Sequence, residues 1–322
     1  MDEPAWTIEN EHLNRAAQVV TRHTWHTPLI PAPNIGARAW LKLETDQHTG
    51  SFKVRGALAR LAALTPAERR ATVVAASAGN HGIGLAFAAQ RLGVKVRVFV
   101  AKRTPMVKRD AIAVAGAKVV VAEAEGYDEA ERLAKEAAAE SGAVFVSPFD
   151  DPWVAAGNGG TLGMEIFDAM SDVDAIVAPV GGGGLVAGLA AAKRRAGVEA
   201  RIIGVQSEAC PAMKRSLEEG HAIERMEGAE TLAEGLEGGV TPTSFHHVRE
   251  AVERIDLVSE EEIADAMRLA HTSMGITVEG SAATVIAWAK KHLADEPGEG
   301  HVVLVVTGRN VDEAVRRRIV GA

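Results

Sequence analysis

Residues 175–192 have the sequence AIVAPVGGGGLVAGLAAA, an uncharged stretch of 18 residues with four successive glycines at positions 181–184. The stretch is about as long as a membrane span, but each glycine costs about 1 kcal/mol relative to alanine in a helix. An apolar run that ends in glycines and leads into an Ala-rich segment is typical of a buried strand, a tight loop and a helix. We therefore predict one strand–loop–helix unit of an α/β fold here.

The same alternation of strand and helix patterns continues on both sides of this unit. Strand patterns alternate with helical patterns from residue 72 to residue 146 and again from residue 160 to residue 206, and a final strand is predicted at 301–306. Short links between strands and helices are typical of parallel sheets with helices on both faces. We therefore predict an α/β protein with parallel-rich sheets flanked by helices.

The segment 148–152, PFDDP, interrupts this alternation and is our candidate crossing between two lobes. We expect a large domain from residues 1–67 and 152–322 and a small domain from residues 68–151. Sheets of this kind bind ligands at the carboxyl ends of their strands. The active site is therefore expected in the cleft between the two lobes.

Composition limits the partners of the protein. The chain has 322 residues, of which 47% are hydrophobic and 24% charged, so a disordered or collagen-like chain is excluded. The net charge of −8 argues against nucleic-acid binding, which needs a clustered basic surface. The single cysteine, Cys210, excludes an intrachain disulfide. The acidic N-terminus lacks the features of a signal peptide, so we expect a cytoplasmic protein that binds neither nucleic acid nor membrane.

Three glycine-rich turns carry the candidate chemistry, and the first is the run from Gly181 to Gly184. A glycine loop that follows a strand and opens a helix lets backbone N–H groups converge on a phosphate, with the helix dipole behind them. The segment Gly182-x-Gly184-x-x-Ala187 also fits the dinucleotide pattern G-x-G-x-x-A, so a dinucleotide-dependent oxidoreductase is an alternative. A flexible turn without function is the third interpretation.

The second turn, Ser77-Ala78-Gly79-Asn80-His81, joins a predicted strand to a predicted helix. Free backbone amides at a helix start form an anion site that suits a carboxylate. Capping of the helix by Ser77 or Asn80 is the alternative, and the segment alone does not decide between the two interpretations.

The third turn contains Lys53, which follows Phe52 at the start of a predicted helix. The helix dipole disfavours a positive charge there and lowers the pKa of the amine. A neutral lysine can form a Schiff base with a carbonyl group and later act as a base. An ordinary surface lysine is the alternative for this residue taken alone.

Four segments occur in the order LKLE (41–44), GSFKVRGA (50–57), SAGNH (77–81) and GGGG (181–184). Together they resemble the threonine/serine dehydratases, which are fold-type II pyridoxal-phosphate (PLP) enzymes of the tryptophan-synthase-β-like class. The resemblance spans nearly the whole chain, and one departure is His48, where family members often have proline. It implies a two-lobed fold-type II enzyme with PLP in the cleft between the lobes.

The resemblance also implies a role for each matching residue. Lys53 would be covalently joined to the cofactor and would take the Cα proton of the substrate. The cofactor would be bound by Phe52 and Gly235 at its ring faces, Asn80 at its phenolic oxygen, Thr307 at its ring nitrogen, and Gly181, Gly182, Gly183 and Gly184 at its phosphate. The substrate carboxylate would be bound by the turn that comprises Ser77, Ala78, Gly79, Asn80 and His81.

A hydroxyl such as that of Thr307 does not keep the ring nitrogen protonated, which favours elimination over transamination. The resemblance therefore implies dehydration and deamination of a β-hydroxy amino acid to a 2-oxo acid and ammonia, with L-threonine and L-serine as the default substrates. One alternative is a 3-hydroxyaspartate dehydratase, which Arg309 would favour if it faced the cleft. Further alternatives are a serine racemase-like enzyme and a non-catalytic amino-acid-binding module.

Two departures from the racemases argue against the racemase alternative. Ala78 stands where serine racemases carry a second serine, and alanine cannot transfer a proton. Gln206 and Ala212 stand where racemase-like members have acidic metal ligands, so we predict no bound metal. The role of Glu279 stays open between a position near the cofactor and a solvated or capping position. A homo-oligomer, either a dimer or a tetramer, is also expected.

Overall fold

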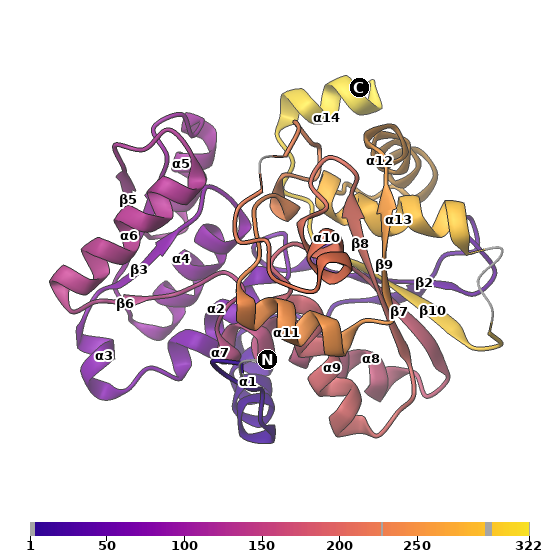
Figure 1. The fold of residues 1–322 in the computed structure, drawn as a ribbon, viewed down its shortest axis with the longest axis horizontal. Coiled ribbons are helices and arrows are strands. Elements are labelled where there is room, and N and C mark those ends of the chain that lie inside the picture. The colour runs from indigo at the N-terminus through magenta and orange to yellow at the C-terminus, as the bar shows by residue number, and fades with distance from the viewer. Residues whose placement is uncertain (1–3, 227, 294–297, 322) are drawn as a thin grey trace.

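The computed structural model describes residues 4–226, 228–293 and 298–321. In this part of the chain, ten strands form two sheets with helices on both sides (Figure 1). The six-stranded sheet has the order β1-β2-β10-β7-β8-β9, and the four-stranded sheet has the order β5-β4-β3-β6. This arrangement confirms the predicted α/β fold with parallel-rich sheets.

The strands of the six-stranded sheet are parallel except for β1, which runs antiparallel to β2. Their bounds are β1 Leu29–Pro31, β2 Ala39–Leu43, β7 Val173–Pro179, β8 Arg201–Ser207, β9 Arg254–Val258 and β10 His301–Val306. The strands of the four-stranded sheet are all parallel. Their bounds are β3 Val73–Ala76, β4 Val96–Val100, β5 Lys118–Val121 and β6 Val144–Phe145.

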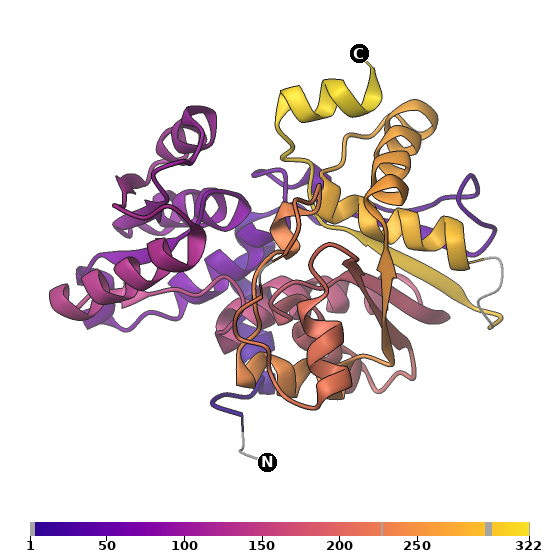
Figure 2. The ribbon, with the colours of Figure 1, turned by 45° about the horizontal axis from the view of Figure 1, so that its top comes forward.

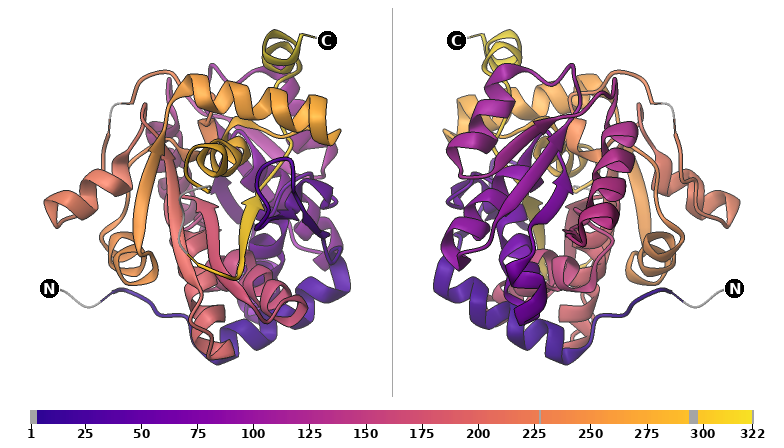
Figure 3. Two further views of the ribbon diagram at one scale, coloured as in Figure 1. Left: turned by 90° about the vertical axis from the view of Figure 1, so that its right-hand side faces the viewer. Right: turned by 90° about the vertical axis from the view of Figure 1, so that its left-hand side faces the viewer.

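Helices cover both faces of the six-stranded sheet (Figure 3). One face packs against α12 (Glu260–Met274) and α13 (Gly280–His292), with the fully buried Trp288 in this part of the core. The other face packs against α8 (Thr161–Ala169) and α9 (Gly184–Ala196). The remaining helices around this sheet are α1 Asn10–His23, α7 Pro152–Ala155, α10 Ala212–Glu219, α11 Pro242–Ala251 and α14 Glu313–Val320.

Figure 2 shows the four-stranded sheet and its helices beside the six-stranded sheet. One face of the smaller sheet packs against α4 (Asn80–Leu92) and the other against α6 (Tyr127–Ser141). Helix α2 (Lys53–Ala62) packs against α4 through an apolar cluster that includes Leu58 and Leu85. The other helices here are α3 Pro66–Arg70 and α5 Met106–Val114.

Several elements of the structure are not predicted from the sequence. These are β1, β9, α3, α10, α11 and α14, most of which are short or lack a clear apolar periodicity. The helix expected from residue 160 is preceded by α7 and a π-helical turn, Ala156–Gly160, whose glycines hide the helical pattern. Helix α5 begins at Met106, with Pro105 as its N-cap residue. Within the described residues, none of the helices is long and apolar enough to cross a membrane.

Candidate active site

Lys53 is the first residue of α2 and is half-buried. Its Nζ donates a hydrogen bond to the carbonyl oxygen of Pro148 at 3.0 Å and lies 5.1 Å from the centre of the Phe52 ring. Burial lowers the pKa of Lys53 to about 8, and the negative charge of Glu279 opposes this effect. The sequence predicts a lowered pKa for this lysine, and burial of the amine acts in the predicted direction. A substantial fraction of this amine is therefore neutral near pH 8.

The backbone before Lys53 is tied to the residues that follow β10. The N–H of Phe52 donates to the carbonyl oxygen of Thr307 at 3.0 Å. The N–H of Arg309 donates to the carbonyl oxygen of Gly50 at 2.9 Å. Gly50 has a φ of +70°, a backbone conformation that favours glycine. These bonds bring Thr307, near the end of the chain, next to the turn that carries Lys53.

The glycine loop at 181–184 follows β7, and its last residue begins α9. A Cβ on Gly182 would lie 2.3 Å from the ring of Phe149, and a Cβ on Gly181 would lie 3.1 Å from the carbonyl oxygen of Gly235. Two other segments of the chain therefore approach the loop so closely that only glycine fits at Gly182. The contact also places Gly235 beside the loop.

Two residues that the sequence analysis does not assign connect these segments. Phe149 follows Pro148, which accepts the hydrogen bond from Lys53, so this segment joins the glycine loop to the lysine. Ser281, in the first turn of α13, accepts a hydrogen bond from the N–H of Gly235 at 3.0 Å. Neither residue belongs to a local motif, because each contact joins segments that are far apart in the sequence.

Asn80 begins α4, and its side chain reaches across to the segments around α13 and β10. Its Nδ2 donates to both carboxylate oxygens of Glu279 at 2.9 Å, and its Oδ1 accepts a hydrogen bond from Nδ2 of Asn310 at 2.7 Å. The neighbouring Gly79 is exposed, with no atom within 4 Å of the position that a Cβ would take. At the start of α4, the side chain of Asn80 is therefore bonded to Glu279, while Gly79 is accessible to solvent.

His81 is buried, and its ring is directed at the backbone rather than at an ionic partner. Its Nε2 lies 3.2 Å from the carbonyl oxygen of Val146, while Nδ1 has no hydrogen-bond partner. Burial, together with the positive charge of Lys53, lowers the pKa of His81 to about 3. The ring is therefore neutral at physiological pH, with the Nε2 proton donated to Val146.

Glu279 is half-buried immediately before α13, and its side chain makes no capping bond to that helix. Burial raises its pKa to about 7, although the hydrogen bond from Asn80 and the charge of Lys53 act in the opposite direction. Its N–H donates to the carbonyl oxygen of Gly308 at 3.0 Å. Glu279 is thus the N-cap residue of α13, but its side chain bonds Asn80 and acts on Lys53 instead of capping the helix.

The electrostatic coupling of Lys53 to Glu279 leads to a first prediction. In cofactor-free protein, Glu279→Gln should lower the pKa of Lys53 below its value of about 8, because the carboxylate favours the protonated amine. The pKa is measured from the rate at which an amine-reactive reagent labels Lys53 as pH is varied, with mass spectrometry to locate the label. The exposed Glu123→Gln is the control. An unchanged or raised pKa of Lys53 in Glu279→Gln would contradict the assignment.

The buried ring of His81 leads to a second prediction, for stability. Between the unfolded-state pKa of about 6.5 and the folded-state pKa of about 3, the unfolded chain binds a proton that the folded protein does not. Stability is therefore lost as pH falls through this range, by up to about 1.4 kcal/mol per pH unit. Urea unfolding of the wild type and His81→Gln at several pH values should show a shallower loss in the variant. Equal slopes would show that His81 does not remain neutral.

Further features that the sequence singles out are the side chain of Arg309, Gln206 and possible metal ligands. Among the residues described by the structure, there is no group of three or more His, Cys, Asp or Glu side chains placed to hold a metal ion. The buried Gln206 accepts a hydrogen bond from the N–H of Lys214 at 2.8 Å. The side chain of Arg309 is exposed.

The groups that converge here suit PLP. A half-buried amine with a lowered pKa is the partner that an aldehyde needs. The glycine loop opens α9, and the N–H groups of a helix start favour a phosphate. Gly235 lies beside this loop, and the amide of Asn80 bonds Glu279, whose charge acts on Lys53.

Comparisons with known proteins agree with this site. A family model described as pyridoxal-phosphate dependent enzyme matches residues 20–308. The chain is 41% identical to an L-threonine ammonia-lyase of Thermotoga maritima, over 88% of this chain and 70% of that protein. It is 37% identical to the catabolic L-threonine dehydratase of Escherichia coli K12, over 88% of this chain and 85% of that protein.

Among solved structures, the processed form of threonine deaminase isoform 2 from Solanum lycopersicum has a TM-score of 0.88 and 29% sequence identity. The alignment covers 99% of this chain and 90% of that chain, so the similarity includes both sheets. The family model and these relatives each cover most of the sequence. The chain therefore belongs to the fold-type II pyridoxal-phosphate dependent enzymes, in the family of the threonine/serine dehydratases, and its cofactor is PLP.

Proposed function

We propose that this protein is a PLP-dependent ammonia-lyase that converts L-threonine, L-serine or both to a 2-oxo acid and ammonia. The β-hydroxyl and the Cα hydrogen leave together as water, and water then displaces the nitrogen as ammonia, so no oxidant is required. The observation that carries the proposal is the half-buried amine of Lys53, with a pKa of about 8, close to the segment that packs on the glycine loop. The relatives named as threonine ammonia-lyase and dehydratase support the substrate class.

Bound PLP supplies the electron sink that makes the Cα proton of an amino acid acidic. Nζ of Lys53 is the base that takes this proton, because an amine with a pKa near 8 combines basicity with a substantial neutral fraction at working pH. The residues proposed to hold the cofactor are Phe52, Lys53, Asn80, Gly181, Gly182, Gly183, Gly184, Gly235 and Thr307. Hydrogen bonds and close contacts between these segments support this set.

We assign the substrate carboxylate to the start of α4. The first N–H groups of a helix have no partner within the helix, and they attract anions. The exposed Gly79 leaves this turn open, and the hydrogen bond from its N–H to Oγ of Ser77 at 3.2 Å shapes it. The side chain of Ala78 adds no polar group to this turn. His81 contributes its backbone N–H, since its neutral ring is bonded to Val146.

The proposal is tested by assaying 2-oxo acid release from both enantiomers of threonine and serine and from 3-hydroxyaspartate. We expect L-threonine or L-serine to have the highest kcat/KM. Turnover of 3-hydroxyaspartate alone would move the assignment to the alternative that Arg309 favours, and release from none of these compounds would overturn the proposal. Chiral analysis of the remaining serine measures racemisation, which Ala78 should keep weak.

Three further predictions belong to this proposal. The division into a large domain (1–67 and 152–322) and a small domain (68–151) is supported by the sheets, because β3 to β6 all lie within the small domain. A homo-oligomer is testable by analytical ultracentrifugation. A cytoplasmic location is testable by cell fractionation.

A further inference from the structure

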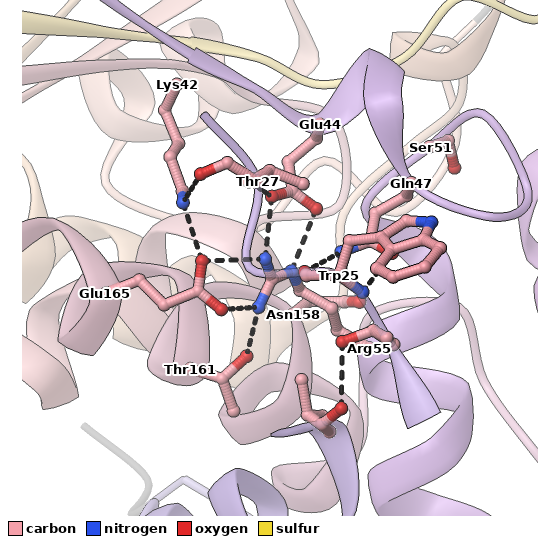
Figure 4. Close-up of polar contacts among 12 residues, drawn as sticks. Trp25, Thr27, Lys42, Glu44, Gln47, Ser51, Arg55, Asn158, Thr161 and Glu165 are labelled. Carbon is pink, nitrogen blue, oxygen red and sulfur yellow. Dashed lines mark hydrogen bonds and ion pairs between the residues drawn. The ribbon is translucent and has the colours of Figure 1, made fainter. Parts of the chain in front are cut away.

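Arg55 lies two residues after Lys53 on α2 and is fully buried. Its guanidinium bonds two carboxylates (Figure 4). Nε and Nη2 donate to Glu44 at 2.8 Å each, and Nη1 and Nη2 donate to Glu165 at 2.6 and 2.9 Å. A further bond joins Nη1 to the hydroxyl of Thr161 at 3.3 Å. All five N–H donors of Arg55 therefore have partners.

Lys42 makes this buried group electrically neutral. Its Nζ donates to Glu165 at 2.6 Å and to the carbonyl oxygen of Thr27 at 2.7 Å, and the Thr27 hydroxyl donates to Glu44 at 2.6 Å. Burial alone would raise the pKa of Glu165, but hydrogen bonds and positive charge from Arg55 and Lys42 lower it, so this carboxyl is ionised. We call Lys42, Glu44, Arg55 and Glu165 the charge cluster (Figure 4).

The charge cluster joins the start of α2 to other parts of the fold. Lys42 lies on β2, Glu44 in the 3₁₀ turn that follows it, and Glu165 on α8. Helix α2 receives no capping bond from the side chain of its N-cap residue, Phe52, although the N–H of Lys53 donates to Oγ of Ser51 at 3.3 Å. Its first turn is instead held by the cluster and by Asn158, whose Oδ1 accepts a hydrogen bond from the N–H of Gly56 at 2.8 Å.

Burial of ion pairs does not by itself explain why such a cluster is present. Replacing a buried ion pair by apolar side chains is often neutral or stabilising, whereas a guanidinium with two carboxylates fixes orientation. Residues two positions apart on a helix point about 200° apart, so Arg55 and Lys53 project to opposite sides of the same turn. Fixing Arg55 therefore fixes the rotation of the turn and the direction in which Lys53 leaves it.

We propose that Arg55 is a positioning residue that, through its bonds to Glu44 and Glu165, holds the first turn of α2 so that the Lys53 amine points at the cofactor and the Cα proton. The inference rests on the proposed role of Lys53. It predicts that loss of the two-carboxylate contact changes the chemistry at Lys53 more than it changes substrate binding. A misplacement of about 1 Å in a catalytic group can cost about 10²-fold in rate.

The test compares holoenzymes of the wild type, Arg55→Lys and Asp174→Asn. Lysine keeps the positive charge but lacks the planar guanidinium that bonds each of the two carboxylates through a pair of N–H groups. Asp174 forms ion pairs with Arg38 and Arg201 near the start of β7, whereas the glycine loop follows the end of this strand. Asp174→Asn therefore controls for the loss of ionic contacts at a place away from Lys53. For each protein, kcat, KM, the pH midpoint of cofactor absorbance and the rate of borohydride trapping at Lys53 are measured.

We expect Arg55→Lys to lose about 10- to 10²-fold in kcat with little change in KM, and to shift both the pH midpoint and the trapping rate. Asp174→Asn should change only thermal stability. Unchanged kcat, midpoint and trapping in a folded Arg55→Lys would overturn the inference. If Arg55→Lys does not fold, the same criteria apply to Glu165→Gln, which leaves the Arg55–Glu44 pair intact. Wild-type trapping at another lysine would instead refute the proposed function.

Discussion

Lys53→Ala is expected to reduce kcat for 2-oxo acid release by at least about 10³-fold, the largest effect of any single substitution on turnover. The variant loses both the amine that joins the cofactor and the base that takes the Cα proton, and a positioned base alone contributes about 10²- to 10⁴-fold. Nζ of Lys53 bonds the carbonyl oxygen of Pro148, and within the described residues no second amine is bonded to it that could replace it. Turnover is measured at saturating substrate and cofactor.

Two further measurements make this result specific. Borohydride reduction followed by peptide mass spectrometry should place the cofactor on Lys53 in the wild type and on no residue in Lys53→Ala. Lys118→Ala removes an exposed lysine at the start of β5 and should retain wild-type turnover. A Lys53→Ala protein with wild-type kcat, or a cofactor found on another lysine, would refute the site.

Gly159→Ala is expected to give the largest loss of stability, at least about 3 kcal/mol in the free energy of unfolding. A Cβ at this position would lie 1.9 Å from the carbonyl oxygen of Leu185 and 2.7 Å from the backbone nitrogen of Leu189. Both are backbone atoms of α9, so no side chain can rotate to make room. Because α9 begins at the glycine loop, the displaced helix should also bind the cofactor more weakly.

The free energy of unfolding is measured by urea titration, with cofactor affinity measured on the same preparations. The control is Gly126→Ala, since Gly126 has a negative φ and no atom within 4 Å of the position of its Cβ. That variant should change the free energy of unfolding by less than about 1 kcal/mol. Equal stability of the two variants would mean that the π-helical turn and α9 are not in backbone contact.

Local pattern in the sequence is sufficient for the elements that lie close to the chemistry. The apolar run and glycines at 175–192 correctly predict β7, the glycine loop and α9, because a buried strand and a helix each have a periodicity that extends over several residues. The same is true of Lys53, which is indeed the first residue of α2. Membership in the dehydratase family also follows from ordered motifs, and the comparisons confirm it.

Local sequence patterns do not predict contacts between segments that are far apart in the chain. The packing of Phe149 on Gly182, the bond of Ser281 to Gly235 and the position of Glu279 beside Asn80 each join residues separated by more than thirty positions. Short elements such as β9 and α10 are stabilised by tertiary packing rather than by their own sequence.

The sequence by itself therefore determined the α/β alternation, the family and the residues that we propose for the site, because these depend on neighbours along the chain. Only the tertiary structure decided the electrostatic state of that site. Burial lowers the pKa of Lys53, and burial keeps the ring of His81 neutral. The tertiary structure also decided that Arg55 lies between the carboxylates of Glu44 and Glu165, which belong to other elements. Burial and charge pairing are properties of folded neighbours, and a linear sequence does not contain their distances.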